Sequence, residues 1–110
     1  MATEKNTQSG NTTMLVLKLL EKQDMYGYQI IDRLAQKSQN VFNLKTGTLY
    51  PLLHGLEKSG MVTSYDQNAD NQRVRKYYSI TSAGKNALVQ KQAEWETYSH
   101  AVKQVMAYAH

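Results

Sequence analysis

The sequence contains no cysteine, and it has a single proline and no long apolar run among its 110 residues. Without cysteine, the chain cannot form a disulfide, carry a thiolate nucleophile or hold a metal ion through sulfur. No run approaches the roughly 20 apolar residues that span a bilayer, and no apolar leader begins the chain. We therefore expect one small cytoplasmic domain with a modest core and no membrane partner.

Charge of either sign is also sparse, with 13 Lys and Arg residues against 9 Asp and Glu residues. The net charge of +4 permits an anionic partner but does not demonstrate one. His54 and His100 lie far apart without carboxylates at ligand spacing, so we expect them at the surface or an interface and expect no metal site. The chain also lacks a nucleophile elbow, a glycine-rich phosphate loop and paired carboxylates, so we expect neither an enzyme nor a cofactor.

Hydrophobic periodicity predicts three helices in the first half of the chain. The polar residues 1–9 are expected to form a flexible N-terminus. Dense apolar positions then predict a helix over about 10–22, and spacings of three and four residues predict helices over about 26–39 and 46–59. Gly60 fits the left-handed cap that commonly ends a helix.

A change of period after the third helix predicts a β-hairpin and then a long helix. Two β-rich runs, 61–65 and 74–80, flank the polar stretch 66–72, which is typical of a hairpin. Thr81 offers a cap for a final helix over 82–110. Its apolar residues follow the 3.5-residue repeat of helices that pack along one another. The residues assigned to a dimer interface on this seam are Leu88, Trp95, Tyr98, Val102 and Val105.

This order of elements predicts a mainly α (α+β) fold. We expect a winged helix-turn-helix with a two-stranded β-wing and a long C-terminal dimerisation helix. The DNA-binding domain would span residues 10–81, and the dimerisation helix would span residues 82–110. Because one subunit alone cannot cover the seam of the last helix, a homodimer is expected.

Several short motifs also follow one another in a fixed order. They are Tyr26-Gly27-Tyr28, Gly47-Thr48-Leu49-Tyr50-Pro51-Leu52-Leu53, Leu56-Glu57, Gly60, Arg75-Lys76-Tyr77-Tyr78, Thr81 and Gly84. Over about residues 14–84, their order and spacing resemble the PadR family of bacterial transcriptional regulators. The single C-terminal helix resembles that of the smaller PadR subfamily. The resemblance implies a homodimeric regulator, in our interpretation a repressor, that binds a palindromic promoter operator with half-sites about one helical turn apart.

The third helix of a winged helix lies in the major groove of double-stranded DNA. The residues expected near base edges and phosphates there are Lys45, Thr46, Thr48, Tyr50, Pro51 and His54. Tyr26 and Tyr28, at the start of the preceding helix, are placed to offer hydroxyls to the DNA backbone. The set lacks a bidentate Asn, Gln or Arg, so we expect shape readout to supply part of the specificity.

The predicted hairpin carries a local cluster of positive charge. Arg73, Arg75 and Lys76 place three cations within four residues, where a wing meets the duplex. Strand alternation puts Arg73, Arg75 and Tyr77 on one face and Lys76 on the other, so one set is expected to point at DNA. The alternative is an ordinary solvated turn.

Two positions depart from the usual pattern. Lys45 stands where PadR members usually have a serine cap, and a cation at a helix N-terminus is unfavourable unless an anion is near. Gly55 lies inside the third helix, where it costs about 1 kcal/mol relative to Ala. Its presence implies either close packing or close approach of the backbone to a partner.

Trp95 allows two interpretations. It resembles the tryptophan that multidrug-responsive members of the family place at the dimer centre, but a tryptophan on such a seam is more often a simple buried interface residue. In the first interpretation a small aromatic or lipophilic effector binds there, with Met14, Leu17 and Ser99 as further lining residues. Two alternatives to a DNA-binding regulator stay open: a winged-helix protein interaction module, and a dimer that acts chiefly as a small-molecule sensor.

Overall fold

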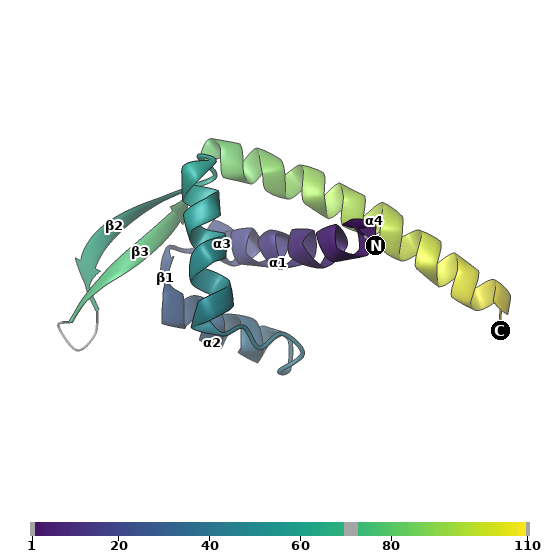
Figure 1. Cartoon of the computed structure of the whole chain (residues 1–110), viewed down its shortest axis with the longest axis horizontal. Coiled ribbons are helices and arrows are strands. Elements are labelled where there is room, and N and C mark those ends of the chain that lie inside the picture. Colours follow the sequence, from purple (N-terminus) through teal and green to yellow (C-terminus); the bar gives the residue numbers. More distant parts are fainter. Residues whose placement is uncertain (1, 70–72, 110) are drawn as a thin grey trace.

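The computed structural model describes residues 2–69 and 73–109, with side chains described for 11–69 and 73–108. Four helices and three strands are present in these residues (Figure 1). Their bounds are α1 Ala2–Lys22, β1 Met25–Tyr26, α2 Gly27–Lys37, α3 Thr46–Lys58, β2 Val62–Asn68, β3 Val74–Ile80 and α4 Ser82–Ala109. The molecule measures 55 × 28 × 26 Å, because α4 extends well beyond the rest (Figure 1). None of the helices described is long and apolar enough to traverse a lipid bilayer.

Helix α1 lies at the centre of the fold, with α4 along one side and α2 on the other (Figure 1). Its dense apolar positions bury Val16, Leu17 and Leu20, as expected for a helix packed on more than one side. The helix begins at Ala2, well before the predicted start near Gly10. The flexibility of residues 1–9 stays a prediction.

Helices α2 and α3 follow the predicted ranges closely. The Gln29 side chain accepts a hydrogen bond from the Tyr26 N–H at 3.2 Å, which closes the start of α2. Helix α3 ends just before Gly60, which has a φ of 81° and forms the predicted left-handed cap. Pro51 is the sixth residue of α3, so it lies in the second turn of the helix. It is exposed, so solvent can satisfy the carbonyl that lacks a helical partner.

The sheet has one strand more than predicted. The hairpin strands β2 and β3 pair from Val62 opposite Ile80 to Asn68 opposite Val74. The short strand β1 pairs antiparallel with the other edge of β3, so the strand order is β1-β3-β2. The expected two-stranded wing is therefore part of a three-stranded sheet. A two-residue strand is too short to produce a recognisable alternation, and residues 70–72 of the predicted turn lie outside the described residues.

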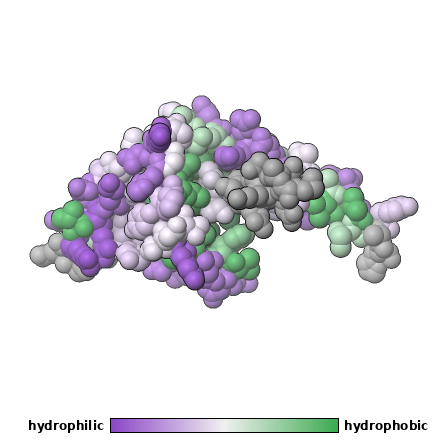
Figure 2. All heavy atoms as spheres, in the orientation of Figure 1, coloured by the Kyte–Doolittle hydropathy of each residue, from purple (hydrophilic) through white to green (hydrophobic). Residues whose placement is uncertain are grey.

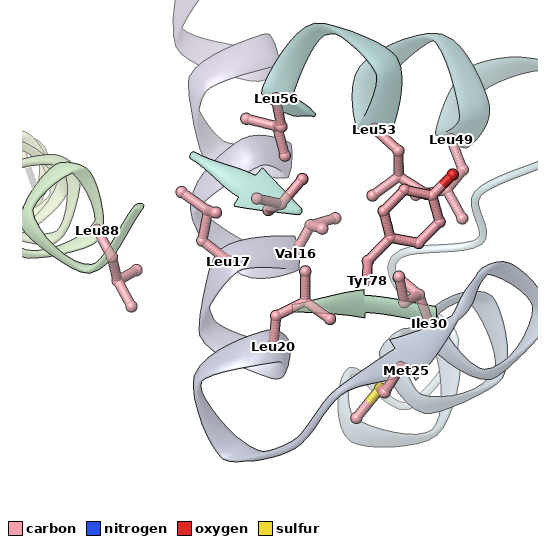
Figure 3. Close-up of a cluster of buried hydrophobic side chains, with 11 residues drawn as sticks. Val16, Leu17, Leu20, Met25, Ile30, Leu49, Leu53, Leu56, Tyr78 and Leu88 are labelled. Carbon is pink, nitrogen blue, oxygen red and sulfur yellow. The ribbon is translucent and has the colours of Figure 1, made fainter. Parts of the chain in front are cut away.

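The core lies where α1, α3 and the sheet meet (Figure 3). Leu49, Leu53 and Leu56 of α3 face Val16 of α1 and Tyr78 of β3, and all are buried. Their spacing of four and three residues puts one side of α3 inward. The opposite side of α3 is thereby fixed toward solvent.

Hydrogen bonds of Thr81 connect the start of α4 to the turn before the hairpin. The Thr81 hydroxyl accepts a hydrogen bond from the Gly84 N–H at 3.1 Å, as the predicted cap requires, and donates one to the Gly60 carbonyl at 2.6 Å. A methyl group at Gly84 would lie 2.7 Å from Cγ1 of Ile80 and would also clash with the Met61 carbonyl. Glycine is needed here for close approach between helix and sheet.

Candidate nucleic-acid interface

The outward side of α3 carries mostly small or polar residues. Its exposed residues are Thr46, Gly47, Thr48, Pro51, His54, Gly55 and Lys58. Four of them belong to the predicted DNA-binding set, and Lys45, also exposed, immediately precedes the helix. A methyl group at Gly55 would meet no atom within 4 Å, so close packing within the chain does not explain this glycine. Approach of the backbone to a partner stays a prediction for Gly55.

The N-terminus of α3 is open to an anion. Lys45 makes no side-chain capping bond, while its carbonyl accepts the N–H groups of Thr48 and Leu49 at 2.9 Å. The first N–H groups of any helix have no partner within that helix. The N–H groups of Thr46 and Gly47 therefore have no partner within the helix, and they follow the exposed Lys45 in the chain, a combination suited to phosphate.

Tyr50 connects the two helices of the helix-turn-helix. A methyl group at Gly27 would lie 2.6 Å from Cζ of Tyr50, so the ring occupies the space that glycine leaves open. This explains the glycine of the Tyr26-Gly27-Tyr28 motif. Tyr50 is half-buried by this contact, in contrast to the exposed Pro51 and His54.

Arg75 is held between two tyrosine rings. Its guanidinium carbon lies 5.2 Å from the ring centroid of Tyr26 and 5.5 Å from that of Tyr28, within cation–π range. The Arg75 Nε is buried and forms no hydrogen bond with any of the described residues. Tyr77 supports the arrangement from the sheet, since its ring meets that of Tyr26 edge-on at 5.3 Å. We call Tyr26, Tyr28 and Arg75 the arginine clamp.

A hollow of about 350 Å³ joins the clamp to α3. Its lining residues are Tyr26, Gly27, Tyr50, His54, Val74, Arg75, Lys76 and Tyr78. The fold thus brings five predicted DNA-binding residues together from three separate segments of the sequence. The predicted residues that do not line this hollow are Tyr28, Lys45, Thr46, Thr48, Pro51, Arg73 and Tyr77. Tyr77 serves as a packing residue within the sheet.

Two hydrogen bonds that the sequence did not reveal fix the hairpin to the helices. The Tyr65 hydroxyl donates to the Asp24 carboxylate at 2.6 Å, and the Ser64 hydroxyl donates to Glu57 of α3 at 2.6 Å. The bond to Asp24 raises the pKa of Tyr65, with burial adding to the effect. Burial also raises the pKa of Tyr78, with the nearby Glu57 carboxylate as a further cause. The Tyr65–Asp24 and Ser64–Glu57 hydrogen bonds both join residues that only the fold brings together.

Comparison with known proteins identifies the family. The Transcriptional regulator PadR-like family matches residues 16–90, which is more than half of the chain. This chain belongs to the PadR-like family. A transcriptional regulator from Mycobacterium tuberculosis is 35% identical over 59% of this chain and 60% of its own length.

Solved structures agree with this assignment. A transcriptional regulator from Clostridium thermocellum shares 33% identity and a TM-score of 0.78 over 86% of this chain and 92% of its own. A PadR family transcription regulator from Clostridium difficile shares 33% identity and a TM-score of 0.73 over 86% and 96%. PadR-like proteins are DNA-binding transcriptional regulators rather than enzymes, and they commonly dimerise.

A second hollow of this PadR-like chain lies beside Trp95. It measures about 310 Å³ and is lined by Met14, Leu15, Lys18, Leu88, Gln92, Trp95 and Glu96. Of the four residues predicted to line an effector site, Met14 and Trp95 line this hollow. Leu17 does not line it, because its side chain is 0% exposed within the core. Ser99 does not line it either, and its hydroxyl donates to the Glu96 carbonyl within α4.

The seam of α4 divides into two parts. Leu88 is 2% exposed and packs in the core of its own chain, so its assignment to a dimer interface was wrong. Trp95, Tyr98, Val102 and Val105 remain between 39% and 64% exposed. Trp95 borders α1 through the hollow described above. The C-terminal turns of α4 extend away from the body (Figure 1), and Figure 2 shows apolar surface there. Within the described residues, no three His, Asp or Glu side chains come together as potential metal ligands.

Proposed function

We propose that this PadR-like regulator represses transcription as a homodimer bound to a palindromic promoter operator. Each subunit would insert α3 into the major groove of one half-site, while the hairpin contacts the flanking backbone. The observation that carries the proposal is the hollow between α3 and β3, where Tyr26, Tyr50, His54, Arg75 and Lys76 meet. DNA binding would place the protein in the cytoplasm, and the single C-terminal helix supports the smaller PadR subfamily.

The surface of α3 supports close approach to DNA. Gly47, Pro51 and Gly55 recur every four residues along its exposed side, so they follow one line on the helix. None of them carries a long side chain that would hold the backbone away from a duplex. Lys45 and the N–H groups beside it are then available to a phosphate. Base contacts would come from Thr48 and His54 at the edges of this line.

The arginine clamp supports a phosphate contact from the wing. The rings of Tyr26 and Tyr28 restrict Arg75 before DNA arrives, so less side-chain entropy is lost on binding. Lys76 and Arg73 are exposed beside it and add positive charge. One pre-positioned guanidinium with two neighbouring cations fits a backbone-reading role better than base recognition.

The test is selection of DNA from a random-sequence pool, followed by affinity measurements over a range of salt concentrations. The selected sequences should share an inverted repeat with half-sites about one helical turn apart. Replacing Arg73 and Lys76 with Ala leaves the clamp intact and should lower the log–log salt slope by about two per subunit. The matched variant, with Lys85 and Lys103 of α4 changed to Ala, should keep the original slope.

Other outcomes would contradict the proposal. Recovery of no common sequence, or a slope that the hairpin variant leaves unchanged, would favour the protein interaction module. A promoter that becomes more active when the protein is bound would overturn the repressor assignment while leaving DNA binding intact.

The hollow beside Trp95 supports a second, compatible function as an effector site. Its mixture of Met14, Leu88 and the indole suits a small aromatic or lipophilic compound. Trp95 is the single tryptophan, so its fluorescence reports this site directly. Titration with planar dyes should quench the fluorescence saturably, and a Met14→Gln variant should weaken the effect. Unchanged fluorescence throughout the titration would remove the effector from the proposal.

A further inference from the structure

A third and larger hollow lies on the α2 side of α1, away from the hollow beside α3. It is a groove of about 720 Å³ between α1 and α2. Its lining residues are Leu15, Lys18, Leu19, Lys22, Gln23, Met25, Arg33, Leu34, Lys37, Ser38 and Phe42. Because it does not include the α3 face or the hairpin, the proposed DNA interface leaves this groove without a role.

The groove has an apolar interior. Met25 and Leu34 are 1% and 4% exposed, and they form its base between the two helices. Leu15 and Leu19 of α1 are partly buried and continue the apolar surface along that helix. Phe42 adds a ring that is 39% exposed. A hydrocarbon chain could be buried here with little contact to polar groups.

The charged groups of the groove all have one sign. Lys18 and Lys22 come from α1 and Arg33 and Lys37 from α2, and no carboxylate is among the lining residues. Glu21 forms an ion pair with Lys18 at 2.9 Å without lining the groove. Lys22, Arg33 and Lys37 form no ion pair with any residue described in the structure. An anionic group at this position would be attracted by Arg33 and Lys37, while Lys22 also interacts with the Glu21 carboxylate, whose pKa it helps to lower.

A turn of unusual conformation places Phe42 beside the groove. Gln39 and Asn40 have φ values of 52° and 68°, in the left-handed region that residues other than glycine seldom occupy. The Phe42 N–H then donates to the Ser38 hydroxyl at 3.0 Å, and the Asn40 N–H donates to the Ala35 carbonyl at 2.8 Å. The phenyl ring is thus positioned by a hydrogen-bonded turn of strained backbone.

We propose that this groove binds an anionic amphiphile, with a long-chain carboxylate as the ligand class. The hydrocarbon chain lies along Leu15, Leu19 and Phe42, and the carboxylate pairs with Arg33 and Lys37. The free end of α4 in a second copy fits less well, since residues 98–109 carry Lys103 and no carboxylate. The proposal goes beyond DNA binding, and the experiments that test it use the protein without DNA.

The first experiment titrates dodecanoate into the full chain by calorimetry, below the concentration at which micelles form. We expect saturable binding of one molecule per chain. Decanoate, which lacks two methylenes, should bind about 15-fold more weakly, because each methylene contributes about fourfold. Dodecyltrimethylammonium, with the same chain and a positive headgroup, should show no saturable binding. Equal binding of both headgroups would overturn the proposal.

The second experiment compares variants. The double variant Arg33→Gln and Lys37→Gln should weaken dodecanoate binding by about tenfold, since it removes two partly exposed ion pairs. Phe42→Ala should weaken binding without changing the preference for an anionic headgroup. Lys85→Gln, a change of the same kind outside the groove, should leave the affinity unchanged.

Sedimentation of the same variants separates a ligand site from a surface between copies. The groove variants should keep the oligomeric state of the original protein. If the double variant or Phe42→Ala shifts a dimer to monomer and dodecanoate fails to bind the original protein, a second copy covers the groove and the proposal is wrong. DNA affinity does not enter this test, so its outcome is independent of the proposed operator binding.

Discussion

Gly27 and Tyr50 depend on each other, because the Tyr50 ring fills the space that Gly27 leaves open. We predict that Gly27→Ala destabilises the protein by about 1–3 kcal/mol, the usual cost of overpacking. A methyl group there would lie 2.6 Å from Cζ of Tyr50. Urea unfolding measures the change. Gly47→Ala is the matched control, since a methyl group there meets nothing within 4 Å.

The same coupling gives the prediction a sharper form. Combining Gly27→Ala with Tyr50→Leu should recover part of the lost stability, because leucine withdraws the clashing ring. A Gly27→Ala variant as stable as the original protein would contradict the close approach of α2 and α3.

Gly55, unlike Gly27, is exposed, and a methyl group there would meet no atom within 4 Å. Gly55→Ala should raise the free energy of unfolding by about 0.5–1 kcal/mol through helix propensity. If the α3 backbone approaches DNA here, the same methyl group should weaken operator binding. Chemical unfolding and DNA titration measure the two effects separately.

A matched variant tests whether these two effects belong together. Asn86→Ala on the exposed surface of α4 also improves helix propensity, and it should leave DNA affinity unchanged. Gly55→Ala binding DNA as tightly as the original protein would show that the backbone of α3 stays away from the duplex.

At the scale of elements, the hairpin is anchored to the loop before β1 by the bond between Tyr65 and Asp24. The folded-state pKa of Tyr65 is raised, so its stabilising effect is complete below the unfolded value near pH 10 and is lost as the pH rises through the folded pKa. Tyr78, whose pKa burial raises, acts in the same direction. The free energy of unfolding should therefore fall above about pH 10.

Substitution assigns part of this alkaline loss to the anchor. Tyr65→Phe cannot ionise, so its unfolding free energy should fall less steeply between about pH 9 and pH 11 than that of the original protein. Tyr108→Phe is the control, since Tyr108 is 92% exposed and should leave the profile unchanged. Identical alkaline slopes for Tyr65→Phe and the original protein would contradict the anchor.

Elements were easier to predict from the sequence than contacts between them. Helix α3 and its cap at Gly60 follow from local apolar spacing and backbone preference, which neighbouring residues determine. Strand β1 could not be predicted, because its two residues become a strand only by pairing with β3. Tyr26 was expected at the start of a helix and lies in β1 instead. The arginine clamp also depends on ring packing that no sequence spacing encodes.

The predicted seam of α4 includes one residue, Leu88, that packs inside its own chain. A 3.5-residue repeat identifies residues that face a neighbour, but it does not say whether that neighbour is α1 of the same chain or another copy. Leu88 faces its own core, whereas Val102 and Val105 face no part of their own chain closely enough to be buried. Only the arrangement of the whole chain determines where along α4 contact with its own core ends.

At the scale of the whole molecule, the exposed end of α4 determines the assembly we propose. We predict that Val105→Glu converts a dimer to a monomer at micromolar concentration. In a two-fold interface each substitution occurs twice, and a buried carboxylate without a partner is costly. Sedimentation velocity measures the change, and affinity for a two-half-site DNA should fall with it because one subunit then reads one half-site.

A charge-matched variant separates loss of the dimer from a general effect of added charge. Gln104→Glu places the same carboxylate one residue away, about 100° around the helix from Val105 and about 200° from Val102, and so off the seam. It should remain dimeric and should bind DNA as the original protein does. Val105→Glu should also keep the helix content and unfolding midpoint of a folded monomer, because its core lies in α1, α3 and the sheet. A Val105→Glu protein that stays dimeric would place the interface elsewhere, and the spacing of the two recognition helices would then have to come from another surface.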